Sequence, residues 1–321
     1  MGANPNQPGS TRRERGSLYQ DVTDRIIAEL ERGRVPWVQP WGGASATLGL
    51  PSNAAIGRRY SGINILILWG AVIEKGFPTQ HWLTFRQALD LGGNVRKGEH
   101  GTTVCYADRF IPKAEIERAA RDGDDPEAVP FLKHFTVFNV AQCDDLPERL
   151  HGHTEPLPER EIVPHAEALI AATGADIRIG GSRACYVVED DYIRVPPQPA
   201  FFDQINYYRT CFHELSHWSG APHRLARDMS GRFGSKHYAR EELVAEMASA
   251  FVCASLNIVP TVRHADYLGS WLEVLREDNR AIFRAASQAS KAADYILAFE
   301  DNAVPTAPAP ARAAQEAEVA A

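Results

Sequence analysis

Apolar positions in the first half of the chain alternate between helical and strand spacing. Apolar side chains recur at every fourth residue from Leu18 to Leu30, which predicts a helix over 17–33. The charged stretch 114–130 has neither spacing and is expected to be an inserted surface loop. Spacing and capping residues also predict helices over 64–75 and 84–91, and strands over 102–110 and 131–140.

The second half shows strand-like segments first and helical spacing later. A helix is predicted over 163–173, followed by short strands over 176–180, 184–188 and 191–195. Four helices are then predicted, over 203–219, 240–256, 265–277 and 279–299. Both halves therefore mix helices and strands, and the fold class expected for the chain is α+β.

A proline-rich stretch without apolar periodicity separates the two halves. It contains Pro147, Pro156 and Pro158 and predicts a linker over 146–162. On either side lie an expected domain over 17–145 and a second over 163–302. Residues 1–16 are polar, and residues 303–321 are rich in Ala, Pro and Glu, so they are expected to form a disordered arm and tail.

Charge is divided unevenly between these halves. The 321 residues are 44% hydrophobic and carry a net charge of −7, which excludes wholesale disorder and a uniformly basic DNA-coating protein. Residues 1–145 carry 17 basic and 17 acidic side chains, whereas residues 146–321 carry 17 and 24. The acidity therefore belongs to the second half, and the first half remains open to nucleic-acid binding.

Cysteine usage and hydropathy predict a cytoplasmic protein without a membrane segment. The five cysteines are widely spaced and form no C-x-x-C pair, which argues against a disulfide framework and against a cysteine-ligated zinc site. The longest apolar run, 63–73, is much shorter than the roughly 20 residues that span a bilayer.

The sequence His213-Glu214-Leu215-Ser216-His217 lies within the helix predicted over 203–219. His213 and His217 are one turn apart, so both imidazoles can reach a single metal ion. Two histidines and one carboxylate are a usual ligand set for a catalytic Zn²⁺ that retains an open position for water. Glu214 would then be the general base that takes the proton of that water.

The third metal ligand has three candidates. Glu242 lies on the helix predicted over 240–256 and is favoured, because packing of that helix against the histidine helix would bring it to the metal. Glu246, one turn later, would hydrogen-bond a ligand imidazole from behind, or would itself be the ligand. His223 completes the spacing H-E-x-x-H-x-x-G-x-x-H, which is typical of metzincins.

The first half combines aromatic and basic side chains. Four of the six tryptophans lie there, interleaved with arginines and lysines. Rings that stack on bases, together with cations that contact phosphates, are typical of single-strand binding surfaces. Each such residue alone is as readily an ordinary core or surface residue.

The order of motifs along the chain resembles the ArdC-type plasmid antirestriction proteins. The N-terminal part of the resemblance, which some plasmid conjugation primases share, rests on Ser17-Leu18-Tyr19, Pro36-Trp37, Gly57 to Asn64, Trp82 to Ala88, Val95 to Glu99 and Phe138 to Gln142. The C-terminal part rests on His213 to Trp218, Gly220, Arg224-Leu225 and Tyr238 to Phe251, which are similar to a zincin-like metallopeptidase domain.

The resemblance implies an N-terminal α+β domain that binds single-stranded DNA and a C-terminal zincin-like α+β metallopeptidase domain. It also implies a protein that protects incoming plasmid DNA from host restriction. The metal would be Zn²⁺ or Mn²⁺, and the peptidase would act on an unidentified protein, such as one of a restriction system. The predicted DNA-binding residues are Arg58, Arg59, Arg86, Arg96 and Lys97 for phosphates, and Tyr60 and Trp82 for stacking. Asn64 and Gln87 are predicted either to hydrogen-bond base edges or to cap backbone groups.

Other functions fit less well. A non-catalytic protein that binds DNA or a restriction enzyme, with a structural metal site, is the main alternative. A DNA mimic should carry denser acidic charge than −7 over 321 residues. A metal-dependent nuclease usually holds its ions with carboxylate clusters rather than with H-E-x-x-H.

Overall fold

A computed structural model describes residues 18–37, 49–122, 125, 129–151, 163–201, 203–232, 234–260 and 267–300. Helices and strands are mixed in both halves of the chain, as the α+β prediction requires. The predicted arm 1–16, the predicted tail 303–321 and most of the predicted linker lie outside the described residues.

The first half is built on a four-stranded sheet in the order β1-β2-β5-β4. A separate two-stranded sheet joins β3 to β6. The helices are α1 (Leu18–Glu31), α2 (Ile63–Lys75), α3 (Phe85–Asp90) and α4 (Lys113–Asp122). The strands are β1 (Ser52–Asn53), β2 (His81–Thr84), β3 (Asn94–Val95), β4 (Thr102–Phe110), β5 (Val129–Asn139) and β6 (Cys143–Asp144).

Local sequence explains where the two central helices begin and end. α2 is apolar around most of its circumference and is accordingly buried, with Leu68 and Trp69 fully enclosed. Gly76 ends it in the left-handed conformation, with φ of 66°. α3 begins at Thr84, whose hydroxyl accepts a hydrogen bond from the Gln87 backbone while the Gln87 side chain accepts one from the Thr84 backbone.

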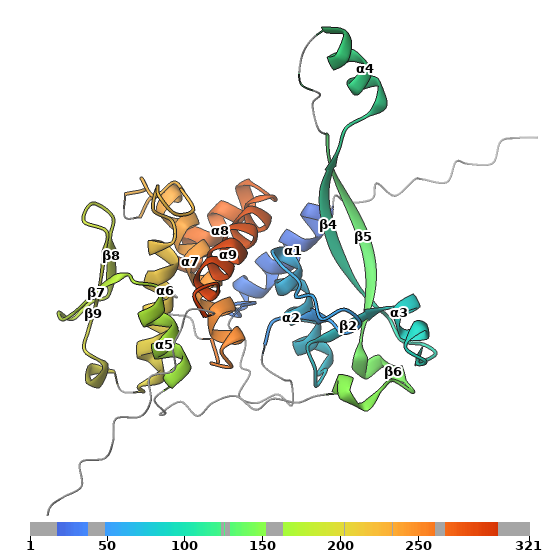
Figure 1. Ribbon diagram of the computed structural model, residues 1–321, viewed down its shortest axis with the longest axis horizontal. Coiled ribbons are helices and arrows are strands. Elements are labelled where there is room, and N and C mark those ends of the chain that lie inside the picture. Colours follow the sequence, from blue (N-terminus) through green and yellow to red (C-terminus); the bar gives the residue numbers. More distant parts are fainter. Residues whose placement is uncertain are drawn as a thin grey trace, which may run out of the picture.

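Strands β4 and β5 form a long antiparallel hairpin that projects from the body of the molecule (Figure 1). The expectation of an inserted surface loop over 114–130 is wrong for 114–122, because these residues belong to α4 at the tip of the hairpin. Lys, Glu, Ala and Arg fill α4 and are all good helix formers. Its partly buried ion pair between Arg118 and Glu115, three residues apart, adds to this preference.

The second half follows the predicted order closely. Its helices are α5 (Pro164–Ala172), α6 (Ile205–Trp218), α7 (Lys236–Ser255), α8 (Leu268–Glu277) and α9 (Ala281–Leu297). Its strands are β7 (Asp176–Ile179), β8 (Cys185–Val187) and β9 (Tyr192–Val195), and they form one sheet in the order β7-β9-β8. β8 is therefore an edge strand, and α6 packs against it and against α7.

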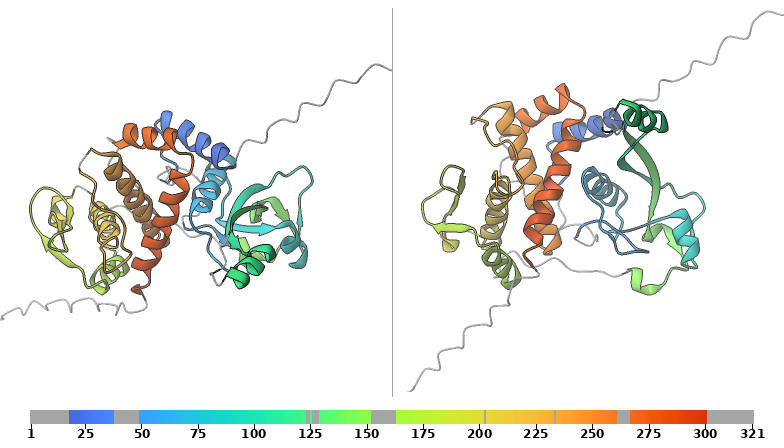
Figure 2. Two further views of the ribbon diagram at one scale, coloured as in Figure 1. Left: turned by 90° about the horizontal axis from the view of Figure 1, so that it is seen from above. Right: turned by 45° about the horizontal axis from the view of Figure 1, so that its top comes forward.

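The hydrophobic core runs without interruption from the first half into the second. The Trp69 ring of α2 meets the Phe251 ring of α7 with centroids 5.6 Å apart, and Trp37 meets Trp271 at 5.7 Å. Figure 2 shows α9 lying beside the helices of the first half. None of the helices in the described ranges is long and apolar enough to cross a bilayer.

Candidate metal centre and nucleic-acid surface

Helix α6 presents both histidines of the H-E-x-x-H sequence to one point. Its sequence INYYRTCFHELSHW buries almost every side chain, so the imidazoles of His213 and His217 are only 2% and 11% exposed. The Nε2 atoms of the two rings are 3.2 Å apart. Spacing by one helical turn thus produces the convergence that the sequence predicts.

Glu242 of α7 completes a set of three donor groups. Its carboxylate lies 3.5 Å from Nε2 of His213 and 3.6 Å from Nε2 of His217. Ligands about 2.0–2.2 Å from a tetrahedral ion are separated by about 3.3–3.6 Å, so the three donors fit the corners of a Zn²⁺-type site. In the described part of the chain, these residues form the one group of three donors that could hold a metal.

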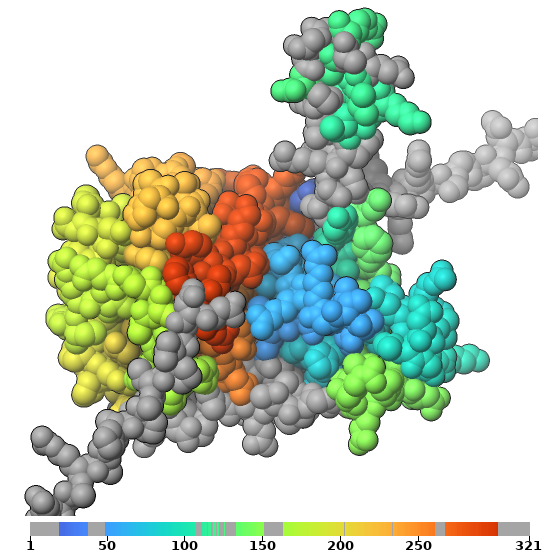
Figure 3. Space-filling view, in the orientation of Figure 1, coloured from blue at the N-terminus to red at the C-terminus, as the bar shows by residue number. Residues whose placement is uncertain are grey.

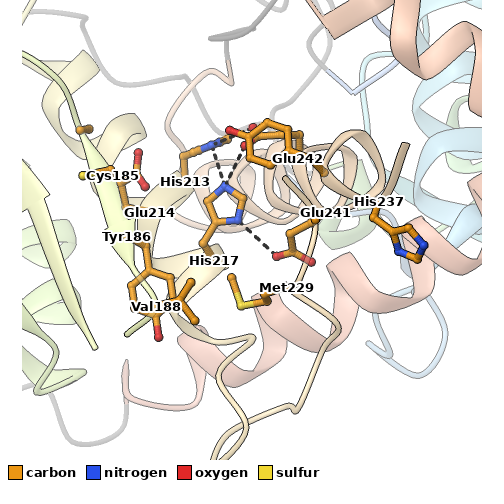
Figure 4. A pocket seen from close by; sticks show the side chains of 13 residues that line it. Cys185, Tyr186, Val188, His213, Glu214, His217, Met229, His237, Glu241 and Glu242 are labelled. Carbon is orange, nitrogen blue, oxygen red and sulfur yellow. Dashed lines mark hydrogen bonds and ion pairs between the residues drawn. The ribbon is translucent and has the colours of Figure 1, made fainter. Parts of the chain in front are cut away.

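A glutamate carboxylate lies behind each imidazole, on the side away from the donor atoms. Figure 4 shows Glu241 in this position beside His217. Nδ1 of His217 is 3.2 Å from the carboxylate of Glu241, and Nδ1 of His213 is 3.8 Å from that of Glu246. Glu246 thus lies beside a ligand imidazole, as predicted, but the distance of 3.8 Å is longer than the hydrogen bond that the prediction assigned to it. Such carboxylates orient a ligand imidazole and increase its basicity.

Glu241 and its partner Arg227 were not predicted from the sequence. The Arg227 guanidinium binds both carboxylate oxygens of Glu241, at 2.7 and 3.1 Å, and also donates to the Ser216 carbonyl at 2.6 Å. The sequence offered one indication of Glu241, namely that it is adjacent to Glu242, because neighbours on a helix can reach different atoms of one site. Nothing in the residues around Arg227 indicates its contact with Glu241.

His223 lies outside the donor group. Its side chain is 62% exposed and contacts Asp191 at 3.3 Å and Arg224 at 2.7 Å. The metzincin-type alternative for the third ligand is therefore not supported by the geometry, and Glu242 is the better candidate.

The electrostatics of this cluster favour an added positive charge. Burial lowers the pKa of His217, but the hydrogen bond to Glu241 and the charge of Glu242 outweigh it and raise the pKa to about 9. Burial likewise raises the pKa of Glu242, but the neighbouring imidazoles outweigh it and lower the pKa to about 2. Carboxylates thus outnumber bases here, which suits a cation between them.

The donor group opens into a cavity of about 240 Å³. Glu214, Tyr238 and Met229 line it together with the metal-ligand candidates. Figure 4 shows Cys185 and Tyr186 of the edge strand β8 across the cavity from Glu242. The cavity therefore combines the candidate metal ligands, a carboxylate and the edge of β8 that pairs with no other strand of the described residues.

Arg224 joins the end of α6 to the strand that borders this cavity. It donates to the Trp218 carbonyl at 2.6 Å and lies over the Trp218 ring. It also pairs with Asp191, which accepts a hydrogen bond of 2.8 Å from the Tyr186 hydroxyl. The position of β8 relative to the histidine helix therefore depends on this contact.

The basic residues predicted to bind DNA fall into two groups. Arg58 and Arg59, with half-buried Tyr60, line a second cavity of about 240 Å³ in the first half. Arg86 and Lys97 are exposed, and no carboxylate of the described residues lies within 4.0 Å of either. Arg96 is different, because it already pairs with Glu99 at 3.1 Å and Asp144 at 3.4 Å.

The structure overturns one further prediction for DNA contact and favours the backbone-capping alternative for two others. The prediction that Trp82 stacks on bases is wrong, because its ring is fully buried and packs edge-on against Phe77. Asn64 uses its amide to bind both backbone groups of Cys105, at 2.7 and 2.8 Å. Gln87 uses its amide to cap α3 and to bind Asn53. Both amides are therefore engaged in contacts that hold the fold together, although Asn64 also lines the cavity of Arg58 and Arg59.

Two family models match the chain in tandem. The N-terminal domain of anti-restriction factor ArdC matches residues 16–138, and a zincin-like metallopeptidase family matches residues 164–288. Among relatives, protein y4eC of Sinorhizobium fredii is 42% identical over 295 residues, covering 89% of this chain and 93% of that protein.

Two DNA primases TraC of Escherichia coli are 38% and 36% identical to the chain. In both, 89% of the chain is covered, but it spans only 28% and 20% of the primases' own length. The likeness is therefore to one segment of each primase.

Solved structures agree with the family models. The metal-free antirestriction protein ArdC from plasmid R388 is 41% identical, with a TM-score of 0.76, and the match covers 89% of this chain and 98% of that one. Its Mn(II)-bound structure matches with a TM-score of 0.73 over 89% and 99% of the chains. With both of its domain types present in order, and matched over nearly the whole length of a solved member, the chain belongs to the ArdC-type antirestriction proteins.

Proposed function

We propose that this protein binds single-stranded DNA with its first half and hydrolyses a protein substrate at a metal site in its second half. In this proposal it acts in the cytoplasm and protects incoming plasmid DNA from host restriction. The observation that carries the proposal is the buried group of His213, His217 and Glu242 beside Glu214. Family membership supports the antirestriction role.

The donor set supports a divalent metal, with Zn²⁺ as the first choice. Two imidazoles and one carboxylate at tetrahedral spacing are typical of catalytic zinc. The R388 relative has a structure with Mn(II), so manganese is the alternative. When bound, either ion would acidify a water molecule and polarise a peptide carbonyl.

The protein's own groups supply the remaining chemistry. Glu214, which lines the cavity, is suited to accept the proton of the attacking water and to return it to the leaving amine nitrogen. Glu241 holds the His217 imidazole from behind, and the Glu246 carboxylate lies 3.8 Å behind that of His213. The edge strand β8 offers unpaired backbone groups to an extended peptide.

The peptidase proposal is tested by Glu214→Gln. We expect at least about 100-fold slower cleavage of a quenched fluorescent protein substrate, because the variant lacks the base. Zn²⁺ affinity should stay within a few fold, since the ligand candidates are unchanged. The same variant is then tested in a plasmid-transfer assay that compares restriction-proficient with restriction-deficient recipients. This assay shows whether cleavage is required for protection of the incoming DNA. Full protection by Glu214→Gln would favour the alternative of a non-catalytic protein with a structural metal.

The DNA proposal is tested by the salt dependence of binding to a single-stranded oligonucleotide. Each phosphate contact contributes about −0.7 to the slope of log affinity against log salt. Arg86→Ala combined with Lys97→Ala should therefore weaken binding and make the slope roughly 1.4 less steep. A matched control removes Arg183 and Arg232, two exposed arginines of the second half, and should leave the slope unchanged. Equal slopes for both double variants would exclude Arg86 and Lys97 as phosphate contacts.

A further inference from the structure

The cavity lined by Arg58 and Arg59 lies where the 54–62 loop meets the β4–β5 hairpin. Arg58, Arg59 and Tyr60 come from the loop, whereas Tyr106 and Phe135 come from β4 and β5. It shares no lining residue with the cavity of the metal-ligand candidates. The ligand of this cavity must therefore be inferred from its own lining residues.

Two aromatic rings are about half exposed on this side of the hairpin. Tyr106 and Phe135 are 46% and 47% exposed, although the tryptophans of the core are fully buried. Their centroids are 6.3 Å apart with the ring planes at 74°. They are diagonal neighbours across the two strands, because Tyr106 pairs with Lys133 and Phe135 with Val104.

Nearer the body of the molecule, the side chains on this face of the hairpin are buried. Val104 and Val137 lie two residues from Tyr106 and Phe135, so they point to the same side of the sheet. Both valines are at most 4% exposed and both line the cavity. The apolar face thus continues outward from the core and ends in a half-exposed aromatic pair, which is suited to a flat apolar ligand.

The cations at this cavity are available to an anion. Within the described ranges no carboxylate lies within 4.0 Å of Arg58 or Arg59, although Asp294 on α9 experiences the charge of Arg59. Two guanidinium groups beside an open aromatic pair match the two parts of a nucleotide, the phosphate and the base.

The side-chain amides that line the cavity already make hydrogen bonds within the protein. Asn64 binds the Cys105 backbone, and Asn53 binds the Ala55 backbone at 3.1 Å and the Gln87 amide at 3.0 Å. These contacts hold the 54–62 loop and the hairpin in place, so the cavity is formed in advance. With its amides used, the cavity offers little hydrogen-bond discrimination between bases.

We propose that this cavity is a nucleobase-binding pocket, in which one base of single-stranded DNA stacks on the Tyr106–Phe135 pair while Arg58 and Arg59 hold adjacent phosphates. The pocket accepts any base, because stacking rather than edge recognition provides the affinity. This inference rests on the proposed binding of single-stranded DNA and adds the place where a base is held.

The test uses a single-stranded oligonucleotide containing 2-aminopurine, whose fluorescence is quenched by stacking. The full-length protein should quench it, and Phe135→Ala and Tyr106→Ala should each weaken binding at least about fivefold and reduce the quenching. Their salt slope should match that of the wild type, because no phosphate contact is removed. Phe135→Trp should restore both affinity and quenching.

Phe85→Ala is the matched control, because Phe85 is 52% exposed on α3 and does not line the cavity. Thermal unfolding of each variant identifies any loss of folding. Normal affinity and quenching in Phe135→Ala and Tyr106→Ala, with wild-type protein bound to DNA, would overturn the pocket alone. An equal loss in Phe85→Ala would also overturn it. If the wild type binds no single-stranded DNA, the proposed function fails as well.

Discussion

At the scale of single residues, the arrangement of the metal-ligand candidates depends on the close packing of Arg227 against Gly220. Gly220 follows α6, and a Cβ atom there would lie 2.8 Å from Nη2 of Arg227 and 2.9 Å from Sδ of Met229. Arg227 is held in place by Glu241, Ser216 and Ser219, so it has little freedom to move aside. Glycine at this position therefore leaves room for Arg227 to bind Glu241, which in turn contacts His217.

Gly220→Ala should consequently weaken metal binding without touching a ligand candidate. Displacing Arg227 frees Glu241, and loss of such an outer contact typically lowers metal affinity about 10- to 100-fold. Competition with a chromophoric zinc chelator measures this. Gly269→Ala is the control, because a Cβ atom there meets nothing within 4 Å. Wild-type affinity in Gly220→Ala would show that Arg227 does not matter to the site.

Residue-level reasoning succeeded where the signal was local. His213 and His217 are one helical turn apart, so their convergence follows from helix geometry alone. Arg227 could not be predicted, because its contact with Glu241 depends on the path of the chain after α6. Trp82 was misassigned and Phe135 missed for one reason: residue type does not reveal which face of a strand the rest of the protein covers.

At the scale of elements, long periodic segments were predicted within a few residues. α6, α7 and α9 and the hairpin β4–β5 are examples. The two-residue strands β1, β3 and β6 carry no periodicity and were missed, since only tertiary pairing defines them. α4 was taken for a loop because its charge was weighed above the helix propensity of the same residues.

The junction between α6 and β8 leads to a prediction about pH. The hydrogen bond from Arg224 lowers the pKa of Asp191 below its ordinary value of 3.8, an effect that outweighs the opposing influence of burial. A lowered pKa in the folded state means that the ionised carboxylate stabilises the fold above pH 3.8, and that this stabilisation is lost as the pH falls below it.

Asp191→Asn should therefore lower the unfolding temperature at neutral pH, and the difference from wild type should shrink as the pH falls below 3.8. Because Asp191 is 39% exposed, solvent screens the pair and the effect should be modest. Thermal unfolding of both proteins across pH 3 to 7 provides the measurement. A difference independent of pH would mean that the carboxylate contributes through shape rather than charge.

At the scale of the whole molecule, the two family segments share one core. The Gly62 backbone of the first half donates to the Ser290 hydroxyl of α9 at 2.7 Å, and Thr23 of α1 donates to the Asn279 carbonyl at 2.7 Å. The space-filling view shows these parts in close contact, with the α4 tip standing apart (Figure 3). The proposed base pocket and the candidate metal centre therefore belong to one packed body.

A shared core predicts shared stability, and Trp69 is the place to test it. Its ring is fully buried in α2 against Phe251 of α7, the helix that carries Glu242. Trp69→Ala leaves a cavity at this contact and should cost about 3–5 kcal/mol. If the halves unfold as one unit, hydrogen exchange in α2 and in α7 should accelerate by the same factor. Faster exchange in α2 with α7 unchanged would show instead that each half is stable by itself, and that the contact between Trp69 and Phe251 joins two independently folded parts.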